Sequence, residues 1–543
     1  MSSPSVPSGP SSAGSAGAGG VKAPAGVAGP AGANPYQWRP PLPPPEAAWS
    51  KLTRARPAEE PRLRVVAAAA GAGLLSAALY GDGVGVNLLL CALGAATAAA
   101  LVAMATGRRA RPWTLAFAAS ALALTAVPAV SDGGWETALA LIASVAVASL
   151  TLHGGRRWAG VLLGTVGLWA HLVPGAAWAV RALRSQHFPA RGKVVPVAKA
   201  VGLAAVLLIL FGSLFAGADS TVADLLESLI PSMDLGDFPV RVVYFVVGTG
   251  LALAAAHTAA APRRWDRLEV PGGRERGRLE WAIPLVAMNL LFGGFVLVQL
   301  VVLIGGYGAI MRRTGMTPAE YARQGFWQLL WVAVLTLVVV AFAKFWAPRS
   351  NDGDRRLVKI MLGLLCVLTL VVVATALVRM SLYLDAFGLS QQRLAVAAME
   401  IWLGVVFLLV LAGGVLAARS WLPRAVVLSG ALALAVFGLI RPDAMVAEQN
   451  VARFEQSHTL DIGYLRGLSA DAVPALDRLP GDYRTCSLQL IAASLADQQS
   501  PWYATSFAES RARQILHDRP VAQDRGAACL RVGYREDPYR YGD

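Results

Sequence analysis

The chain has 543 residues, of which 55% are hydrophobic and only 15% are charged. A soluble protein carries about a quarter charged residues, so this composition excludes an ordinary soluble enzyme or binding domain and indicates a protein of the lipid bilayer. The net charge of +14 does not indicate nucleic-acid binding, because the basic residues lie in short loops between apolar segments and form no face with interleaved aromatic residues.

The first segment, residues 1–61, consists mainly of Pro, Ala, Gly and Ser. Such a composition cannot bury enough apolar surface to offset the entropy lost on ordering. We therefore predict a disordered tail that lies in the cytoplasm.

Residues 62–441 contain apolar runs close to 20 residues long, the length that crosses a hydrocarbon core of about 30 Å. The predicted fold is an all-α polytopic membrane protein with about 11–13 transmembrane helices. The predicted spans are 65–80, 85–105, 112–130, 135–152, 195–217, 239–261, 281–305, 325–347, 357–379, 394–418 and 422–440.

The stretch 158–180 is ambiguous because Pro174 and Gly175 lie near its middle. If it crosses the membrane once, every later basic loop falls on the outer side. If it dips in and returns, broken at Pro174-Gly175, the basic loops lie in the cytoplasm and the acidic loop 219–237 lies outside. We therefore predict a re-entrant hairpin or a tight pair of short helices here.

The region from Gly305 to Leu330 contains a helix-start signal, in which Thr317 is the N-cap and Glu320 completes a capping box. Arg312 and Arg313, just before it, fall on the outer side against the positive-inside trend. We therefore expect these two arginines to meet an anionic lipid headgroup or the acidic loop.

Two charged residues, Arg379 and Glu400, lie within neighbouring spans at similar depth. Because charges inside a membrane are costly, we predict that they pair. The pair is either structural or part of a proton or substrate pathway. By contrast, His171 and His257 look like single core histidines rather than metal ligands.

Residues 442–543 form a polar C-terminal region that we predict to be helical and extracytoplasmic. We expect the last span to continue as a helix through 443–456, a second helix to start at Ser469 and end at 480–481, and further helices over 485–497 and 502–517. The region also holds two of the four cysteines, Cys486 and Cys529. Because disulfides persist in oxidising compartments, these two are the candidate disulfide, although two unrelated thiols are the alternative.

Several motifs resemble the membrane-protein families numbered 4153 and 4173 among domains of unknown function, which are common in actinobacteria. The most specific is the Tyr-Ala-Arg-Gln-Gly-Phe-Trp run that contains Arg323; the others are FAGADS (215–220), MNLLFGGFVLVQL (288–300), the connection 379–393, RPDAMVAEQNVAR (441–453) and DIGYLRGLSADAVPAL (461–476). The resemblance implies a multipass membrane protein without an assigned chemistry.

The sequence contains no phosphate-binding glycine motif, nucleophile elbow or metal-spaced cluster of Cys and His. We therefore expect no cofactor and no catalytic residues, and an enzyme is the less favoured class. Our first hypothesis is a non-enzymatic protein of the cytoplasmic membrane for envelope sensing, assembly or structural interaction, with a partner bound through 442–543. The alternative is a transporter or channel that uses Arg379 and Glu400.

Overall fold

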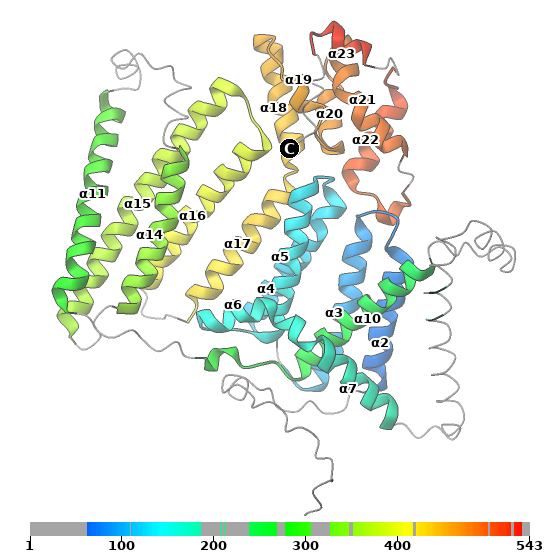
Figure 1. The fold of residues 1–543 in the computed structure, drawn as a ribbon, viewed down its shortest axis with the longest axis horizontal. Coiled ribbons are helices and arrows are strands. Elements are labelled where there is room, and N and C mark those ends of the chain that lie inside the picture. The colour runs from blue at the N-terminus through cyan, green and yellow to red at the C-terminus, as the bar shows by residue number, and fades with distance from the viewer. Residues whose placement is uncertain are drawn as a thin grey trace, which may run out of the picture. The chain divides into compact units, whose positions relative to one another are not determined.

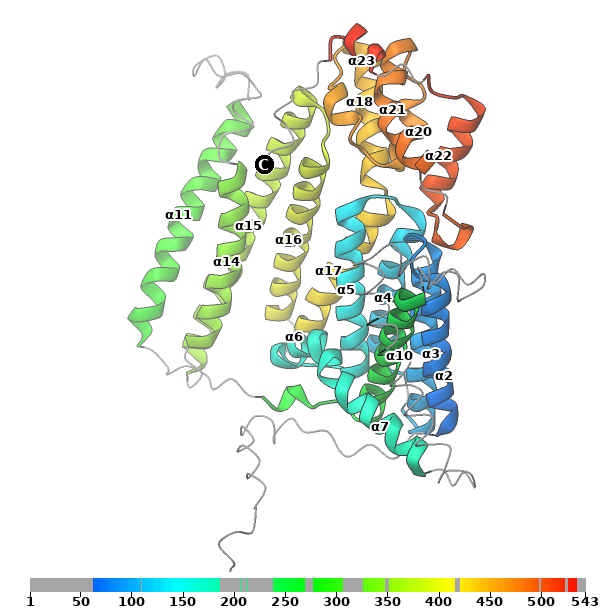
Figure 2. The same ribbon diagram turned by 45° about the vertical axis from the view of Figure 1, so that its right-hand side comes forward.

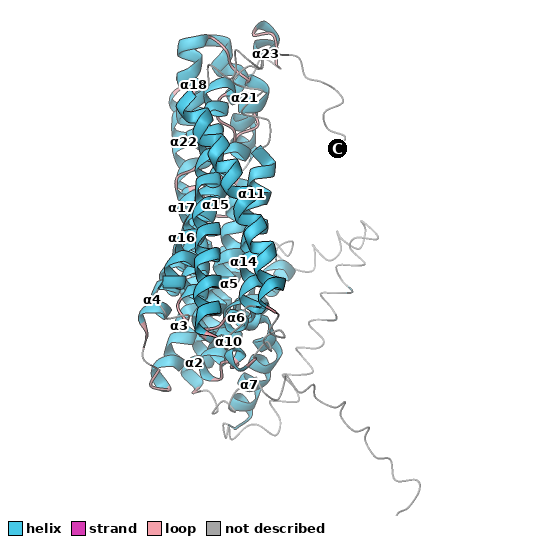
Figure 3. Ribbon diagram, turned by 90° about the vertical axis from the view of Figure 1, so that its left-hand side faces the viewer, coloured by secondary structure: helices cyan, strands magenta, loops and turns pink. Residues whose placement is uncertain are grey.

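The computed structural model of the protein describes residues 62–108, 110–185, 238–268, 277–305, 326–346, 351–415, 420–497, 500–522 and 526–534, with the single residues 207 and 211. These residues belong to one compact unit. Within them, the chain forms helices and loops and no strand (Figure 3). The predicted tail 1–61, the acidic loop 219–237 and, apart from residues 207 and 211, the span 195–217 lie outside the described residues.

Nine helical segments of the described chain are long and apolar enough to cross a membrane. They are α3 (Val86–Ala105), α4 (Pro112–Val130), α5 (Gly134–His153), the continuous segment of α6, η1 and α7 (Trp158–Ser185), α10 (Phe238–Ala260), α11 (Arg278–Gly305), α15 (Asp352–Phe387), α16 (Gln391–Val415) and α17 (Leu422–Leu439). Two further apolar helices, α2 (Leu63–Leu79) and α14 (Phe326–Trp346), complete the bundle. The predicted all-α polytopic membrane fold is confirmed.

The bundle has two groups of helices joined through α17 (Figures 1 and 2). In the first group, α2, α3, α7 and α10 share one apolar core, and α4, α5 and α17 share another. In the second group, α11, α14, α15 and α16 enclose a third core around Phe407 and Leu365, both fully buried. Large apolar side chains such as Leu290, 71% exposed, cover the outer faces, as expected for helices that are solvated by lipid.

The C-terminal helices pack on one another at the end of the bundle where α17 finishes (Figure 1). They share their own core, which includes Leu389 from the turn between α15 and α16. Their bounds are α18 Pro442–Ser457, α19 Ile462–Leu465, η3 Ala470–Ala472, α20 Val473–Leu476, α21 Gly481–Asp497, η4 Trp502–Ala504, α22 Phe507–Asp518 and α23 Ala527–Arg531. We call this group the C-terminal helical region.

The segment 158–185 does not break where the sequence predicted. The interruption is the 3₁₀ turn η1 (Gly167–His171) between α6 (Trp158–Val166) and α7 (Leu172–Ser185). Pro174 lies in the first turn of α7, where its missing N–H costs no helical hydrogen bond. Both α6 and α7 lie at the end of the bundle opposite the C-terminal helical region (Figures 1 and 2).

Two other helices differ from the prediction at their ends. α15 is longer than the predicted span 357–379, because Asn351 caps its start by accepting the Gly353 N–H at 3.0 Å and Gly388, with φ of 79°, ends it. The last span does not continue through 443–456 as one helix. The chain turns at Arg441, whose φ is 55°, and α18 begins at Pro442.

Candidate functional site

The C-terminal helical region holds the turn between α4 and α5 through a reciprocal set of hydrogen bonds. Asp471 Oδ2 accepts the Ser131 hydroxyl and the Asp132 backbone N–H, both at 2.8 Å. In return, Asp132 Oδ2 accepts the Ala470 backbone N–H at 3.1 Å. We call these four residues the carboxylate clasp. Hydrogen bonds to charged acceptors are stronger than neutral ones, so the clasp ties the two regions firmly together.

A third carboxylate, Asp443, extends the clasp toward α16. Asp443 begins α18, is 2% exposed, and accepts the Ser469 N–H at 2.9 Å and the side-chain amide of Gln391. The Gln391 N–H in turn donates to the Tyr464 hydroxyl at 2.8 Å. The turn between α15 and α16 is therefore held by the same region that holds the turn between α4 and α5.

The turn between α2 and α3 is the third that the C-terminal helical region contacts. The Tyr503 hydroxyl donates to Asp82 at 2.9 Å. Gly83, with φ of 136°, lies so close that an added Cβ would come within 2.7 Å of the Ala504 carbonyl oxygen. Three separate turns of the bundle are thus fixed by the C-terminal helical region, two in the first helix group and one in the second.

Negative charge is concentrated at the clasp. Asp132, Asp443 and Asp471 interact electrostatically with one another, and Glu136 and Glu509 add to the same field. Burial raises the pKa of Asp132 to about 6; the Ala470 N–H opposes this rise, and the neighbouring carboxylates add to it. Burial also raises the pKa of Asp471, against the hydrogen bonds from Asp132 and Ser131. The clasp therefore binds protons more readily than free aspartates do, and Asp132 loses its proton around pH 6.

Arg441 is the cation beside the clasp, with its Nε 3.9 Å from Asp471 Oδ1. Its backbone is left-handed, which costs a residue other than glycine about 1 kcal/mol or more. A cavity of about 190 Å³ opens between Arg441, Glu448, Asp471 and Arg511. Strained backbone and a charged cavity at the joint between bundle and C-terminal helices mark this joint as a candidate functional site.

The structure joins the two cysteines that the sequence singled out. The Cys486 and Cys529 sulfur atoms are bonded, with the Cα atoms 4.8 Å apart. The bond connects α21 to α23, and both cysteines are buried beside Ile462. Cys91 and Cys366 are free and buried in the bundle.

The remaining sequence candidates have different outcomes. Arg312, Arg313, Glu320 and Arg323 lie outside the described residues. Glu400 is 1% exposed, and neither of its carboxylate oxygens has a hydrogen-bond partner. The structure therefore does not show the predicted pair of Glu400 and Arg379. The pair was predicted from similar depth and from the cost of charges inside a membrane, whereas the rotation of each helix about its axis also decides which side chains meet.

His171 and His257 are not single core histidines as expected. Their Nδ1 atoms are 2.8 Å apart, and the His153 ring centroid is 5.4 Å from that of His171. Three of the six histidines of the chain therefore meet between α5, η1 and α10. Within the described residues, no group of His, Cys, Asp or Glu has the arrangement of a metal site.

Sequence reasoning did not single out Asp132, Asp443 or Asp471. The last two were nonetheless visible, because they lie in the motifs RPDAMVAEQNVAR and DIGYLRGLSADAVPAL. An aspartate within each of two motifs that follow the last span was the available signal. Nothing in the local sequence links Asp132 to Asp471, which are 339 positions apart.

Comparison with protein families identifies the family of the chain. The family described as Domain of unknown function (DUF4153) matches residues 116–479, about two-thirds of the chain, and the chain belongs to it. No curated protein and no solved structure matches. The matched residues contain both sides of the carboxylate clasp, whereas Cys486 and Cys529 lie beyond them.

Proposed function

We propose that this family member is a non-enzymatic protein of the cytoplasmic membrane in which the C-terminal helical region receives an envelope signal or partner and passes it to the bundle. The carboxylate clasp is the observation that carries the proposal. It fixes an extramembrane body to the turn between α4 and α5 through buried, charge-coupled hydrogen bonds, and a partner bound to that body would act on the bundle through these contacts.

The distribution of basic residues supports an extracytoplasmic place for this region. Arg108, Arg111, Arg156 and Arg263 lie in turns at the other end of the described helices, and Arg355 lies in the first turn of α15 at the same end. By the positive-inside rule that end faces the cytoplasm, as does the start of α2. The disulfide fits an oxidising compartment on the opposite side. From the motifs we further propose that the chain is related to the family numbered 4173 and comes from an actinobacterium.

Complementation of a deletion strain under cell-wall, ionic and redox stress tests the role. The wild type and an Asp518→Asn control should restore growth, because Asp518 is exposed and outside the clasp. Asp471→Ala should fail at equal abundance in the membrane, because Ser131 Oγ and Asp132 N lose their acceptor. Full complementation by Asp471→Ala would refute a role for the clasp in signalling.

A transporter or channel is the second candidate, and Glu400 is the observation that favours it. A buried carboxylate without a hydrogen-bond partner, inside the second helix group, is typical of an ion or proton pathway. Flux of protons or cations into proteoliposomes that is abolished in Glu400→Gln would support transport. Wild-type flux no higher than that of protein-free vesicles, or flux that Glu400→Gln leaves unchanged, would remove this candidate.

A further inference from the structure

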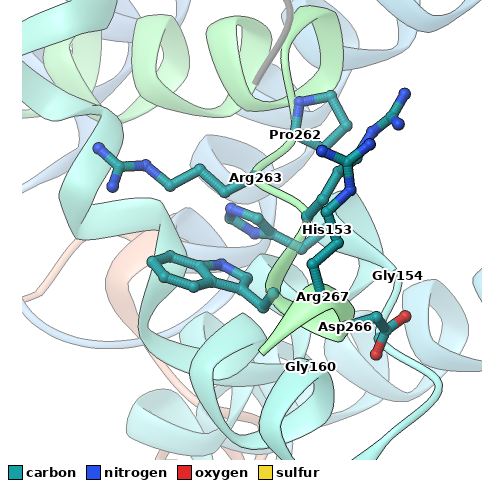
Figure 4. A pocket seen from close by; sticks show the side chains of 10 residues that line it. His153, Gly154, Gly160, Pro262, Arg263, Asp266 and Arg267 are labelled. Carbon is teal, nitrogen blue, oxygen red and sulfur yellow. The ribbon is translucent and has the colours of Figure 1, made fainter. Parts of the chain in front are cut away.

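A second cavity lies at the end of the bundle opposite the carboxylate clasp. Its volume is about 220 Å³, and its walls are the segment 262–267 after α10, the glycines that precede and enter α6, and His153 at the end of α5. Figure 4 shows the His153 ring between Arg263 on one side and Arg267 and Asp266 on the other. Since α5 and α10 are apolar spans that end here, the cavity lies at the depth of the lipid headgroups.

Positive charge dominates the walls of this cavity. Arg263, Arg264 and Arg267 line it, and Asp266 is the one carboxylate among the lining residues. Both Asp266 oxygens already accept backbone N–H groups, from Arg156 at 2.9 and 3.0 Å and from Arg157 at 2.9 Å. The carboxylate thereby caps the start of α6 and is not directed at the three guanidinium groups.

Glycine makes this arrangement possible. A Cβ added to Gly160 would lie 1.9 Å from Asp266 Oδ1, so the cap on α6 requires glycine there. The carbonyl groups around the cavity are also occupied. Arg424 Nε donates to the Gly155 carbonyl at 2.5 Å, and Arg108 donates to the Ala259 carbonyl at 2.7 Å. Among the lining arginines, Arg263 lies over the Trp265 ring at 5.6 Å from its centroid, whereas Arg264 and Arg267 are exposed.

Two buried polar atoms in the walls have no hydrogen-bond partner. They are Nε2 of His153, a residue 8% exposed, and Nε1 of Trp265, a residue 9% exposed. His153 Nδ1 lies 2.9 Å from the Ser149 carbonyl, which can only accept, so Nδ1 carries a hydrogen. Nε2 then accepts in the neutral ring and donates in the protonated ring. Unpaired buried groups cost free energy. His153 Nε2 lies against Gly167 of η1, where an added Cβ would come within 2.7 Å of it, so the Trp265 N–H is the group that a ligand in the cavity would pair.

We propose that this cavity binds a phosphate group, supplied by an anionic lipid headgroup or by free phosphate. The three arginines provide guanidinium donors for phosphate oxygens, and the Trp265 indole N–H provides a neutral one. Basic cavities on the cytoplasmic side of transmembrane helices are a known type of anionic-headgroup site.

Thermal unfolding of the full-length protein in a neutral detergent tests the proposal. The probes are phosphatidylglycerol and inorganic phosphate. Zwitterionic phosphatidylcholine, which has no net charge, is the reference. Arg264→Gln/Arg267→Gln removes two lining charges, both on exposed residues, so the variant should fold. Arg355→Gln/Arg356→Gln is the matched control, because it removes two exposed charges at the same end of the bundle but outside the cavity.

Phosphatidylglycerol or inorganic phosphate should raise the unfolding temperature of the wild type and of the control, whereas phosphatidylcholine should not. The Arg264/Arg267 variant should bind the effective probe about tenfold more weakly for each arginine lost. A response to the lipid alone identifies a headgroup site, and a response to inorganic phosphate identifies a free-phosphate site. Equal stabilisation of both double variants, or no stabilisation by either anionic probe, would overturn the proposal.

Discussion

Replacing Asp132 by Asn tests whether a buried carboxyl makes the junction sensitive to pH. The change removes the charge and keeps an oxygen that can accept the Ala470 N–H. The folded protein raises the Asp132 pKa from 3.8 to about 6. At about 1.4 kcal/mol for each pH unit, this difference favours the protonated carboxyl in the folded state by about 3 kcal/mol.

The sign follows from the raised pKa. The stabilising contribution is complete below pH 3.8, decreases as the pH rises toward 6, and is lost above it. Between about pH 5 and about pH 7.5, Asp132 alone should lower the free energy of unfolding by about 1.4 kcal/mol. Asp132→Asn has no proton to lose, so its stability should fall by that much less over the same interval.

The assay is thermal unfolding in a neutral detergent at the two pH values, and the quantity of interest is the difference between wild type and variant, because other groups cancel in it. Asp518→Asn, which removes an exposed carboxylate from α22, should follow the wild type. If Asp132→Asn keeps the wild-type pH dependence, burial of this carboxyl does not set the response of the junction.

Three further substitutions probe other parts of the molecule. Cys486→Ser should lower the stability of the C-terminal helical region by about 4 kcal/mol on the entropic model, because the bond closes a separation of 43 residues; two free thiols in unreduced wild-type protein by mass spectrometry would contradict the bond. Gly73→Ala would place a Cβ 1.9 Å from Thr249 Oγ1 and 2.7 Å from the Phe245 carbonyl, so the unfolding free energy should fall by about 1–3 kcal/mol, whereas Gly71→Ala, with no atom within 4 Å, should not be destabilised. Glu400→Gln should unfold at the same or a higher temperature than the wild type, because it removes a buried charge that has no hydrogen-bond partner; a lower unfolding temperature would mean that the charge is needed for folding.

Features that depend on composition and length were predictable from the sequence. The spans follow from runs of apolar residues whose length matches the bilayer, and α3, α4 and α10 begin and end within one residue of the prediction. Cys486 and Cys529 could be singled out because the other two cysteines lie inside apolar runs. In these cases the physical cause is local to a short stretch of chain.

Features that depend on how distant segments meet were not predictable. His171 and His257 are 86 positions apart and come together only because η1 packs against α10. Asp132 and Asp471 each look like ordinary turn residues until the C-terminal helical region folds over the turn between α4 and α5. Pro174 misled the prediction of a break because a proline inside an apolar run suggests a kink, whereas a proline in the first turn of a helix is compatible with its start.

The clasp and the arginine-lined cavity are physically linked through α5. This helix has 20 residues, which corresponds to a length of about 30 Å. It starts beside Asp132 and ends at His153 in the cavity wall. Proximity to one rigid helix does not by itself establish coupling, because coupling needs a displacement of α5 that both ends sense. Asp471→Ala removes two hydrogen bonds that hold the start of α5 and is able to cause such a displacement. Asp132→Asn keeps the Asp471 acceptor and should not displace α5. A difference between the two variants in anion binding at the cavity would therefore separate movement of the helix from a change of charge.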